Sequence, residues 1–438
     1  MKNYRQGHQI VLLVLFILSS TISHAQDFQR TRPERLGFDS DRLDHLDESL
    51  QDYINEGLIA GSVALVLRNG RIAYSSAKGM QDIENDIPME EDTIFRIASQ
   101  TKAIVSTAIM ILHERGQLKI SDPLSMYFPA WADAKVGVLN DEGELDLVDL
   151  NRSITLRDLL THTSGIGYGN WIGGTEAHRA AWSEAGFNGW YFASEEEPIG
   201  ELVTKMASLP QFEQPGVQWI YGYNIDILGA VVEVASGQPL DDFLSQEIFE
   251  PLGMDDTQFF LPQDKALRLA KVYRGVFNVG MNQSDQNIEP APDVGSRLGQ
   301  GQYVDGPRTT FSGGAGLTST ASDYAKFLQM TLNGGEFNGA RILGPKTVEL
   351  MVTDHIAHIG FNPGSGMGLG FSVLKDVGAR GTHGSVGEYG WGGAYHSTYW
   401  VDPVENLVVV YLTQILEPSA ELDDFDTLRS GIYSAIME

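Results

Sequence analysis

The 438-residue chain contains no cysteine. This absence excludes disulfide bonds, thiolate metal ligands and a cysteine nucleophile. The chain also lacks the Gly-x-Ser-x-Gly elbow of α/β-hydrolases, the His-Glu-x-x-His zinc motif and the phosphate-binding P-loop. We therefore expect no metal ion and no cofactor.

Basic residues are scarce as well. The chain has 30 lysines and arginines against 58 aspartates and glutamates, which gives a net charge of −28. A charge of this sign opposes binding to nucleic acid and to anionic membrane surfaces, so we expect neither partner. Hydrophobic residues make up 42% of the chain and charged residues 20%, which is typical of a globular domain.

The N-terminus carries a different pattern. Lys2 and Arg5 precede an apolar run over residues 10–18, and Ser23-His24-Ala25 follows with small residues at its two ends. This order is typical of a secretory signal peptide, and the apolar run is too short to span a bilayer. We expect cleavage near Ala25, a periplasmic or secreted protein and no stable membrane anchor. An N-terminal anchor that stays uncleaved is the alternative.

The two ends of the chain have strand patterns, and the middle is mainly helical. Helices are predicted near residues 39–53, 199–208, 226–236, 240–248, 322–332 and 422–436, and strands at 61–67, 71–74, 370–374, 394–401 and 407–413. Residues 166–193 are rich in glycine and aromatics without a clear period, so we expect a loop that either packs on the core or lines a pocket.

This arrangement predicts an α+β fold in which strands from both chain ends share one antiparallel sheet flanked by helices. We expect a single domain over residues 26–438. Its α/β lobe would comprise about 35–95 and 335–438, and its helical lobe about 96–334.

A serine and a lysine three residues apart form the strongest candidate site. The spacing occurs three times, at Ser75/Lys78, Ser99/Lys102 and Ser372/Lys375. Only the middle copy opens a long apolar helix pattern, which would place both side chains on one face near free backbone N–H groups. A serine needs a nearby base to become a nucleophile, and a buried lysine can serve.

Three further stretches accompany this pair. They are residues 160–165 (Leu-Thr-His-Thr-Ser-Gly), 219–229 (Trp-Ile-Tyr-Gly-Tyr-Asn-Ile-Asp-Ile-Leu-Gly) and 383–403, which contains Trp391-Gly392-Gly393-Ala394. In this order the motifs resemble the serine β-lactamase and penicillin-binding-protein superfamily, over about residues 35–436. Within it the chain is most similar to class C β-lactamases and family VIII carboxylesterases. The resemblance implies a β-lactamase/transpeptidase-like fold.

The resemblance also implies roles for individual residues. Ser99 would be the nucleophile that forms an acyl-enzyme, assisted by Lys102 and Tyr221 as acid and base. Which of the two takes the serine proton stays open. The backbone N–H groups of Ser99 and Ala394 would form the oxyanion hole.

The sequence departs from class C β-lactamases at two places. Tyr223 stands where their Tyr-x-Asn motif has asparagine, and Trp391 stands where their Lys-Thr-Gly motif has lysine. The second change removes a cation that would hold a β-lactam carboxylate and adds an apolar wall. Residues predicted to bind substrate are Tyr223, His383, Trp391, Gly392 and Gly393. The alternatives are that Tyr223 and Trp391 are core aromatics and that His383 makes structural hydrogen bonds. For His162 we expect structural hydrogen bonds.

We therefore expect an exported serine hydrolase that cleaves carboxylic esters, with a small-molecule ester or acyl compound as substrate. A β-lactamase or a peptidase acting on D-amino-acid peptides is the first alternative, since it would use the same machinery. The second is an inactive relative that binds cell-wall fragments. The sequence does not indicate an oligomeric state.

Overall fold

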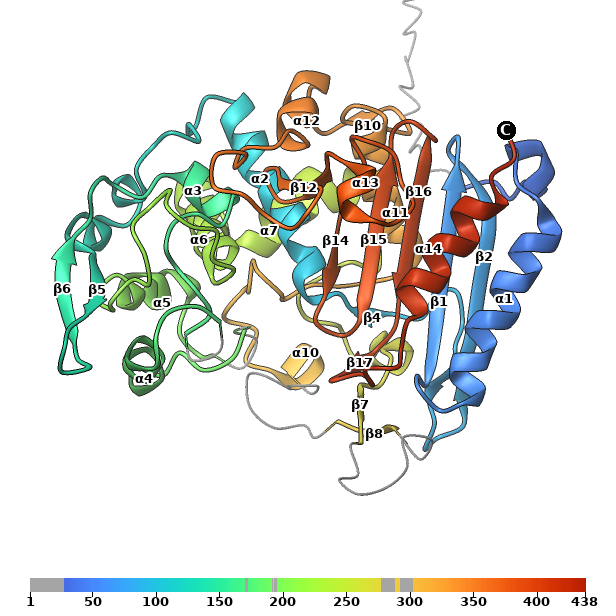
Figure 1. Ribbon diagram of the computed structural model, residues 1–438, viewed down its shortest axis with the longest axis horizontal. Helices are drawn as coiled ribbons and strands as arrows, with labels where there is room; N and C mark the ends of the chain where they lie inside the picture. The colour runs from blue at the N-terminus through green and yellow to red at the C-terminus, as the bar shows by residue number, and fades with distance from the viewer. Residues whose placement is uncertain (1–26, 170–171, 191, 193–194, 277–287, 292–301) are drawn as a thin grey trace, which may run out of the picture.

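A computed structural model describes residues 27–169, 172–190, 192, 195–276, 288–291 and 302–438 (Figure 1). The predicted signal peptide lies outside these ranges. The main sheet has eight strands in the order β12-β13-β14-β15-β16-β1-β2-β3, and all its neighbours run antiparallel. Five of these strands are β12 (Ser365–Met367), β13 (Ser372–Leu374), β14 (Tyr389–Gly393), β15 (Ser397–Asp402) and β3 (Ile87–Pro88).

The two ends of the chain meet in the middle of this sheet. Strand β1 (Gly61–Arg68) pairs with β16 (Leu407–Leu412) on one side and with β2 (Arg71–Asp82) on the other. The β1–β2 turn has positive φ at both Asn69 and Gly70, as a tight hairpin turn requires. The predicted α+β fold, with one sheet built from both chain ends, is confirmed.

Helices cover both faces of the sheet. Helices α1 (Ser40–Asn55) and α14 (Asp424–Ala435) pack against each other and bury leucines and isoleucines on one face (Figure 1). Helix α11 (Ala321–Leu332) contacts β16 and β1 on the other face, although the sequence grouped it with the helical lobe. All eight residues of β1 are buried, because successive side chains enter one core or the other.

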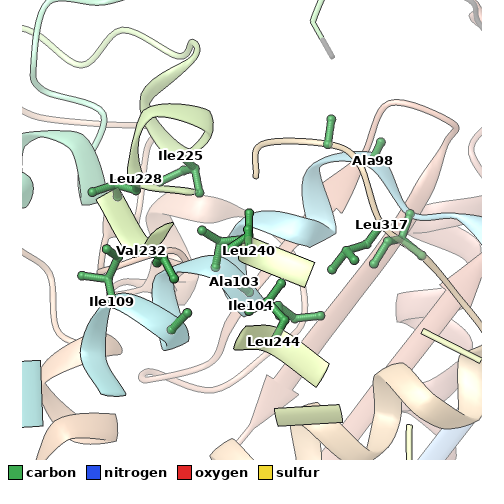
Figure 2. Packing of buried hydrophobic residues seen from close by; sticks show 14 of the residues in the cluster. Ala98, Ala103, Ile104, Ile109, Ile225, Leu228, Val232, Leu240, Leu244 and Leu317 are labelled. Carbon is green, nitrogen blue, oxygen red and sulfur yellow. The ribbon is translucent and has the colours of Figure 1, made fainter. Parts of the chain in front are cut away.

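Helix α2 (Thr101–Glu114) lies at the centre of the helical region and is buried from Thr101 to Leu112. Figure 2 shows its Ile104 and Ile109 beside Leu228 and Val232 of α6 (Asn224–Ser236) and near α7 (Leu240–Leu244). A helix that is apolar all round is stable only inside the protein. This burial places the start of α2, and with it Ser99, in the interior beside the sheet.

A helix and a hairpin are among the elements that were not predicted. Helix α4 (Glu176–Glu184) forms within the expected loop at 166–193, because Thr175 caps its N-terminus and Trp182 is buried on its inner side. Strands β5 (Lys135–Leu139) and β6 (Leu145–Asp149) form a hairpin. The predicted helices at 199–208, 226–236, 240–248, 322–332 and 422–436 are present with shifts of a few residues at their ends. Among the described residues, no helix has both the length and the apolar character needed to cross a membrane.

Candidate active site

Ser99 lies in a short 3₁₀ turn, η2 (Ala98–Gln100), that leads directly into α2. Ala98 has φ of 42°, a left-handed conformation that costs an alanine roughly 1–2 kcal/mol. The chain is held at this point because the backbone N–H of Ile97 donates to the carbonyl oxygen of Leu317 at 3.1 Å. Figure 2 shows Leu317 and Ala98 at the start of α2. The serine is therefore presented from a strained turn that is pinned by its neighbours.

Lys102 is 2% exposed and makes three hydrogen bonds. Its Nζ donates to Ser99 Oγ at 3.1 Å, to the hydroxyl of Tyr168 at 2.8 Å and to the carbonyl oxygen of Gly314 at 2.6 Å. An ammonium group has three N–H donors, so each has one acceptor. The structure thus brings together the serine and lysine selected from the sequence.

The other two Ser-x-x-Lys copies are not built this way. Ser75 lies on β2 and donates to Glu91, while Lys78 pairs with Asp47 at 2.8 Å. Ser372 is on β13, where its hydroxyl donates to the carbonyl oxygen of Gly390, and its Lys375 pairs with Asp354. In neither copy does the lysine contact its serine.

Tyr221 lies between the lysine and the tryptophan of the third motif. The centre of its ring is 4.7 Å from Lys102 Nζ, and its hydroxyl accepts a hydrogen bond of 3.2 Å from Trp391 Nε1. The ring of Tyr168 meets that of Tyr221 edge-on at 5.4 Å. Burial, reinforced by the neighbouring Tyr221, raises the pKa of Tyr168 well above its usual range. Tyr168 is therefore a neutral phenol at ordinary pH.

The buried residue His162 packs against Tyr221 and is hydrogen-bonded to Asn224. Asn224 Nδ2 donates to His162 Nδ1 at 3.0 Å and to the carbonyl oxygen of Ile166 at 3.0 Å. The imidazole lies 4.8 Å from the Tyr221 ring. Burial first, and then the charge of Lys102, lower the pKa of His162 well below its usual range. A neutral histidine with a hydrogen-bonded Nδ1 fits the structural role expected for His162.

Asp226 orients the third acceptor of the lysine. Its Oδ1 accepts from Ser312 Oγ at 2.7 Å and from the backbone N–H of Gly314 at 2.9 Å. Burial raises the pKa of Asp226, and the nearby Lys102 charge opposes that rise. A Cβ atom at Gly314 would lie 2.2 Å from Asp226 Oδ2, so only glycine fits there. The carboxylate thereby holds the Gly314 carbonyl oxygen toward Lys102.

A pocket of about 520 Å³ opens beside Ser99. Its walls are largely aromatic and include Tyr168, Trp190, Tyr221, Trp391, Tyr399, Trp400 and Phe425. One side is the end of β14, where Trp391, Gly392 and Gly393 lead into Ala394. On that side β13 pairs with β14 only through Tyr389 and Gly390, so within the described chain the rest of the β14 edge faces the pocket. A substrate can lie close along such an edge.

Two residues predicted to bind substrate do not line this pocket. Tyr223 is fully buried, its hydroxyl donates to the carbonyl oxygen of Gly189 at 2.7 Å, and its ring stacks on Trp182. His383 lies in an exposed segment and stacks on Tyr433 at 6.2 Å. Tyr223 is a core aromatic in this structure, because the chain turns into α6 there and carries its side chain away from that of Tyr221.

The sequence missed two contributors to the site, Tyr168 and Gly314. Tyr168 lies three residues after the Thr-Ser-Gly motif, within residues 166–193. Lining a pocket was one of the two alternatives for that stretch, and this position is the one sequence feature that could have identified Tyr168. Gly314 lies in the polar region before α11 and had no motif of its own. Its contact with Lys102 depends on long-range packing.

Comparisons with known proteins identify the family of this chain. The family described as Beta-lactamase matches residues 46–430. The chain belongs to that family. Esterase EstB of Burkholderia gladioli is 32% identical, over 89% of this chain and 94% of that protein. Lovastatin esterase of Penicillium rubens is 30% identical, over 89% and 98% respectively.

Among solved structures, EstCE1, described as a hydrolase with promiscuous acyltransferase activity, superposes with a TM-score of 0.74. Its identity is 27%, and the match covers 92% of this chain and 99% of that one. The expected superfamily and the β-lactamase/transpeptidase-like fold are therefore confirmed. The chain is an enzyme of the serine hydrolase type, and it is similar to carboxylesterases of the family.

Proposed function

We propose that this enzyme hydrolyses uncharged carboxylic esters through an acyl-enzyme formed on Ser99. The observation that carries the proposal is the buried contact of 3.1 Å between Lys102 Nζ and Ser99 Oγ. Ser99 Oγ attacks the ester carbonyl carbon while its proton passes to the pair formed by Lys102 and Tyr221. The alcohol then leaves with a proton, and water attacks the acyl-enzyme to release the acid and restore the serine.

The tetrahedral intermediates require donors for the negatively charged oxygen. The backbone N–H groups of Ser99 and Ala394 are our candidates, since both residues line the same pocket. The end of β14 lies close to the serine turn, because a Cβ atom at Gly393 would come within 2.6 Å of the Ile97 carbonyl oxygen. This approach supports placing the Ala394 N–H beside the reacting carbonyl group.

Proton transfer has two candidate bases. Lys102 is one candidate to accept the serine proton directly, since its Nζ contacts Ser99 Oγ. Tyr221 could share the transfer, because its ring lies against Lys102 while its oxygen accepts from Trp391 Nε1. The contacts are compatible with both.

The pocket favours uncharged esters over β-lactams and D-amino-acid peptides, both of which carry a carboxylate. Trp391 supplies an indole where a cation would be needed, and the nearby walls are aromatic. The two arginines of the pocket, Arg380 and Arg429, are both paired with Glu388. The esterase names of two relatives that are 30% or more identical point the same way.

Parallel turnover of p-nitrophenyl butanoate and a chromogenic cephalosporin tests the proposal. We expect a clear preference for the ester, a loss of at least about 1,000-fold in kcat for Ser99→Ala, and wild-type activity for Ser75→Ala, which alters an equivalent motif outside the site. Preference for the cephalosporin would favour the β-lactamase alternative. Full ester hydrolysis by Ser99→Ala would refute the mechanism.

We further propose that the protein is exported and cleaved after Ala25. The charged start, the apolar run and the small residues before the cut support this, and the mature chain would then begin at Gln26. N-terminal sequencing of protein recovered from the periplasm or the medium should give Gln26-Asp27-Phe28. Recovery of an intact N-terminus in a membrane fraction would support the uncleaved anchor instead.

A further inference from the structure

His396 ends the loop that joins β14 to β15 and has an unusual backbone conformation. Its N–H donates to the carbonyl oxygen of Gly393 at 3.1 Å, and its φ is 58°. A three-residue hairpin loop commonly ends in a left-handed residue, for which glycine is best suited. A histidine there costs roughly 1–2 kcal/mol more, so its side chain needs compensating contacts.

Two residues of α14 supply those contacts. His396 Nε2 lies 2.7 Å from Oδ1 of Asp424, whose carboxylate is fully buried. The imidazole also stacks on Phe425, with ring centres 4.1 Å apart and planes at 11°. A carboxylate oxygen accepts hydrogen bonds, so the imidazole tautomer with its proton on Nε2 donates to Asp424. The ring is thus fixed between the loop and the start of α14.

The second ring nitrogen remains available to a ligand. The His396 side chain is 14% exposed and lines the same pocket as Ser99. Nδ1 makes no hydrogen bond to the described residues, and it is not a fully buried atom. The pocket that it lines presents more apolar than polar surface. The His396 imidazole therefore lines the cavity with one ring nitrogen free of a partner in the described part of the chain, two residues beyond Ala394.

We propose that His396 is a specificity-determining residue whose Nδ1 binds a free hydroxyl group of the substrate. This inference rests on the proposed ester hydrolysis at Ser99. A hydroxyl group fits because it can donate to Nδ1 of a neutral imidazole and accept from Nδ1–H of a protonated one. Asp424 acts through His396 as a positioning residue. The preferred substrates are esters with a hydroxyl group in the alcohol part, as in a glycerol ester, or in the acyl part.

Two matched substrate pairs test this, each read as a ratio of kcat/KM values. The alcohol arm compares 2,3-dihydroxypropyl butanoate with propyl butanoate, and the acyl arm compares methyl 6-hydroxyhexanoate with methyl hexanoate. We expect the wild-type enzyme to prefer the hydroxylated ester in one pair. His396→Gly keeps the left-handed backbone but removes the ring, and should reduce that preference about 10-fold. His396→Asn tolerates the same φ and supplies a side-chain amide that can hydrogen-bond, so it should keep part of the preference.

Asn406→Gly is the matched control. Asn406 also has a left-handed conformation, with φ of 49°, but lies in the turn between β15 and β16, away from the pocket. It should keep the wild-type preference. An unchanged preference in folded His396→Gly, an equal loss on both members of a pair, or no preference in the wild-type enzyme would each overturn the inference. Absence of turnover on every ester would instead refute the proposed function.

Discussion

Lys102 Nζ donates a hydrogen bond of 2.8 Å to the hydroxyl of Tyr168, a residue 66 positions further along the chain. This contact gives the lysine a neutral phenol as one of its three acceptors, beside Ser99 and Gly314. The ammonium group therefore has one partner from each of three separate segments. Its direction toward Ser99 depends on all of them.

Tyr168→Phe should lower kcat by about 10- to 100-fold with little change in KM. The substitution leaves a buried N–H of Lys102 without an acceptor, which costs more for a charged donor than for a neutral one. Tyr223→Phe is the matched control, since it removes a buried hydroxyl that donates to the carbonyl oxygen of Gly189, and Tyr223 does not line the pocket. The control should lose about 1 kcal/mol of stability and keep kcat. Equal kcat values for Tyr168→Phe and the wild-type enzyme would contradict the prediction.

Trp391→Lys should shift the substrate preference from uncharged esters toward carboxylate-bearing β-lactams. The lysine would add a cation to the pocket and remove both an aromatic wall and the indole N–H that reaches Tyr221. We expect kcat/KM for p-nitrophenyl butanoate to fall about 10-fold while that for a cephalosporin rises. Trp391→Phe separates the two effects, because it removes the N–H without adding charge. A rise in cephalosporin turnover in both variants would show that the cation is not responsible.

Gly314→Ala should impair both stability and activity. The added Cβ atom would lie 2.2 Å from Asp226 Oδ2, so the 312–314 segment must move and take the acceptor of Lys102 with it. We expect a loss of about 1–3 kcal/mol in urea unfolding together with a reduced kcat. Gly378→Ala, whose Cβ would meet only an aspartate oxygen at 3.4 Å, should change neither. Wild-type stability of Gly314→Ala would show that the segment is not tightly packed.

His162→Asn should change how stability depends on pH. Burial lowers the pKa of His162 in the folded state, so below about pH 6.5 the unfolded chain binds a proton that the folded chain does not. The wild-type protein then loses about 1.4 kcal/mol per pH unit from this residue until the folded pKa is reached. Asparagine does not titrate and tolerates the positive φ of 56°.

The variant should be less stable than the wild-type protein at pH 7.5, because it loses buried hydrogen bonding and packing. The difference should narrow as the pH falls from 7.5 to 5.5, since only the wild-type protein is destabilised by this proton. Urea unfolding at three pH values measures it. A difference that stayed constant or widened would contradict the assignment of a neutral histidine at this position.

Much of the fold was predictable because its signals are local. The turn at Asn69-Gly70 and the apolar runs of β1 and β16 identify strands at both chain ends. The continuous apolar character after Ser99 identifies a buried helix and separates this Ser-x-x-Lys from the two others. The hairpin of β5 and β6 was missed because most of it lies at the surface, where Leu147 is 56% exposed and only Val136 and Gly137 are buried, too few for a clear alternating pattern.

The site was harder to predict than the fold, because its contacts join distant segments. Tyr221 and Tyr223 are two residues apart in one motif, yet one lines the pocket and the other is fully buried. Composition and spacing do not distinguish them. The contacts of Lys102 with Tyr168 and Gly314 cross 66 and 212 positions of sequence, and only the folded packing defines them.

The pairing of β1 with β16 has a consequence for the order of folding. The inner strand β1 ends at Arg68 and is made long before its partner β16, which begins at Leu407. Pairing over such a sequence separation is slow. Until it occurs, the apolar strand β1 has no partner on that side, which favours aggregation. A fragment ending after α11 should therefore fail to fold alone and depend on chaperones, because it lacks β16, the strand that pairs with β1.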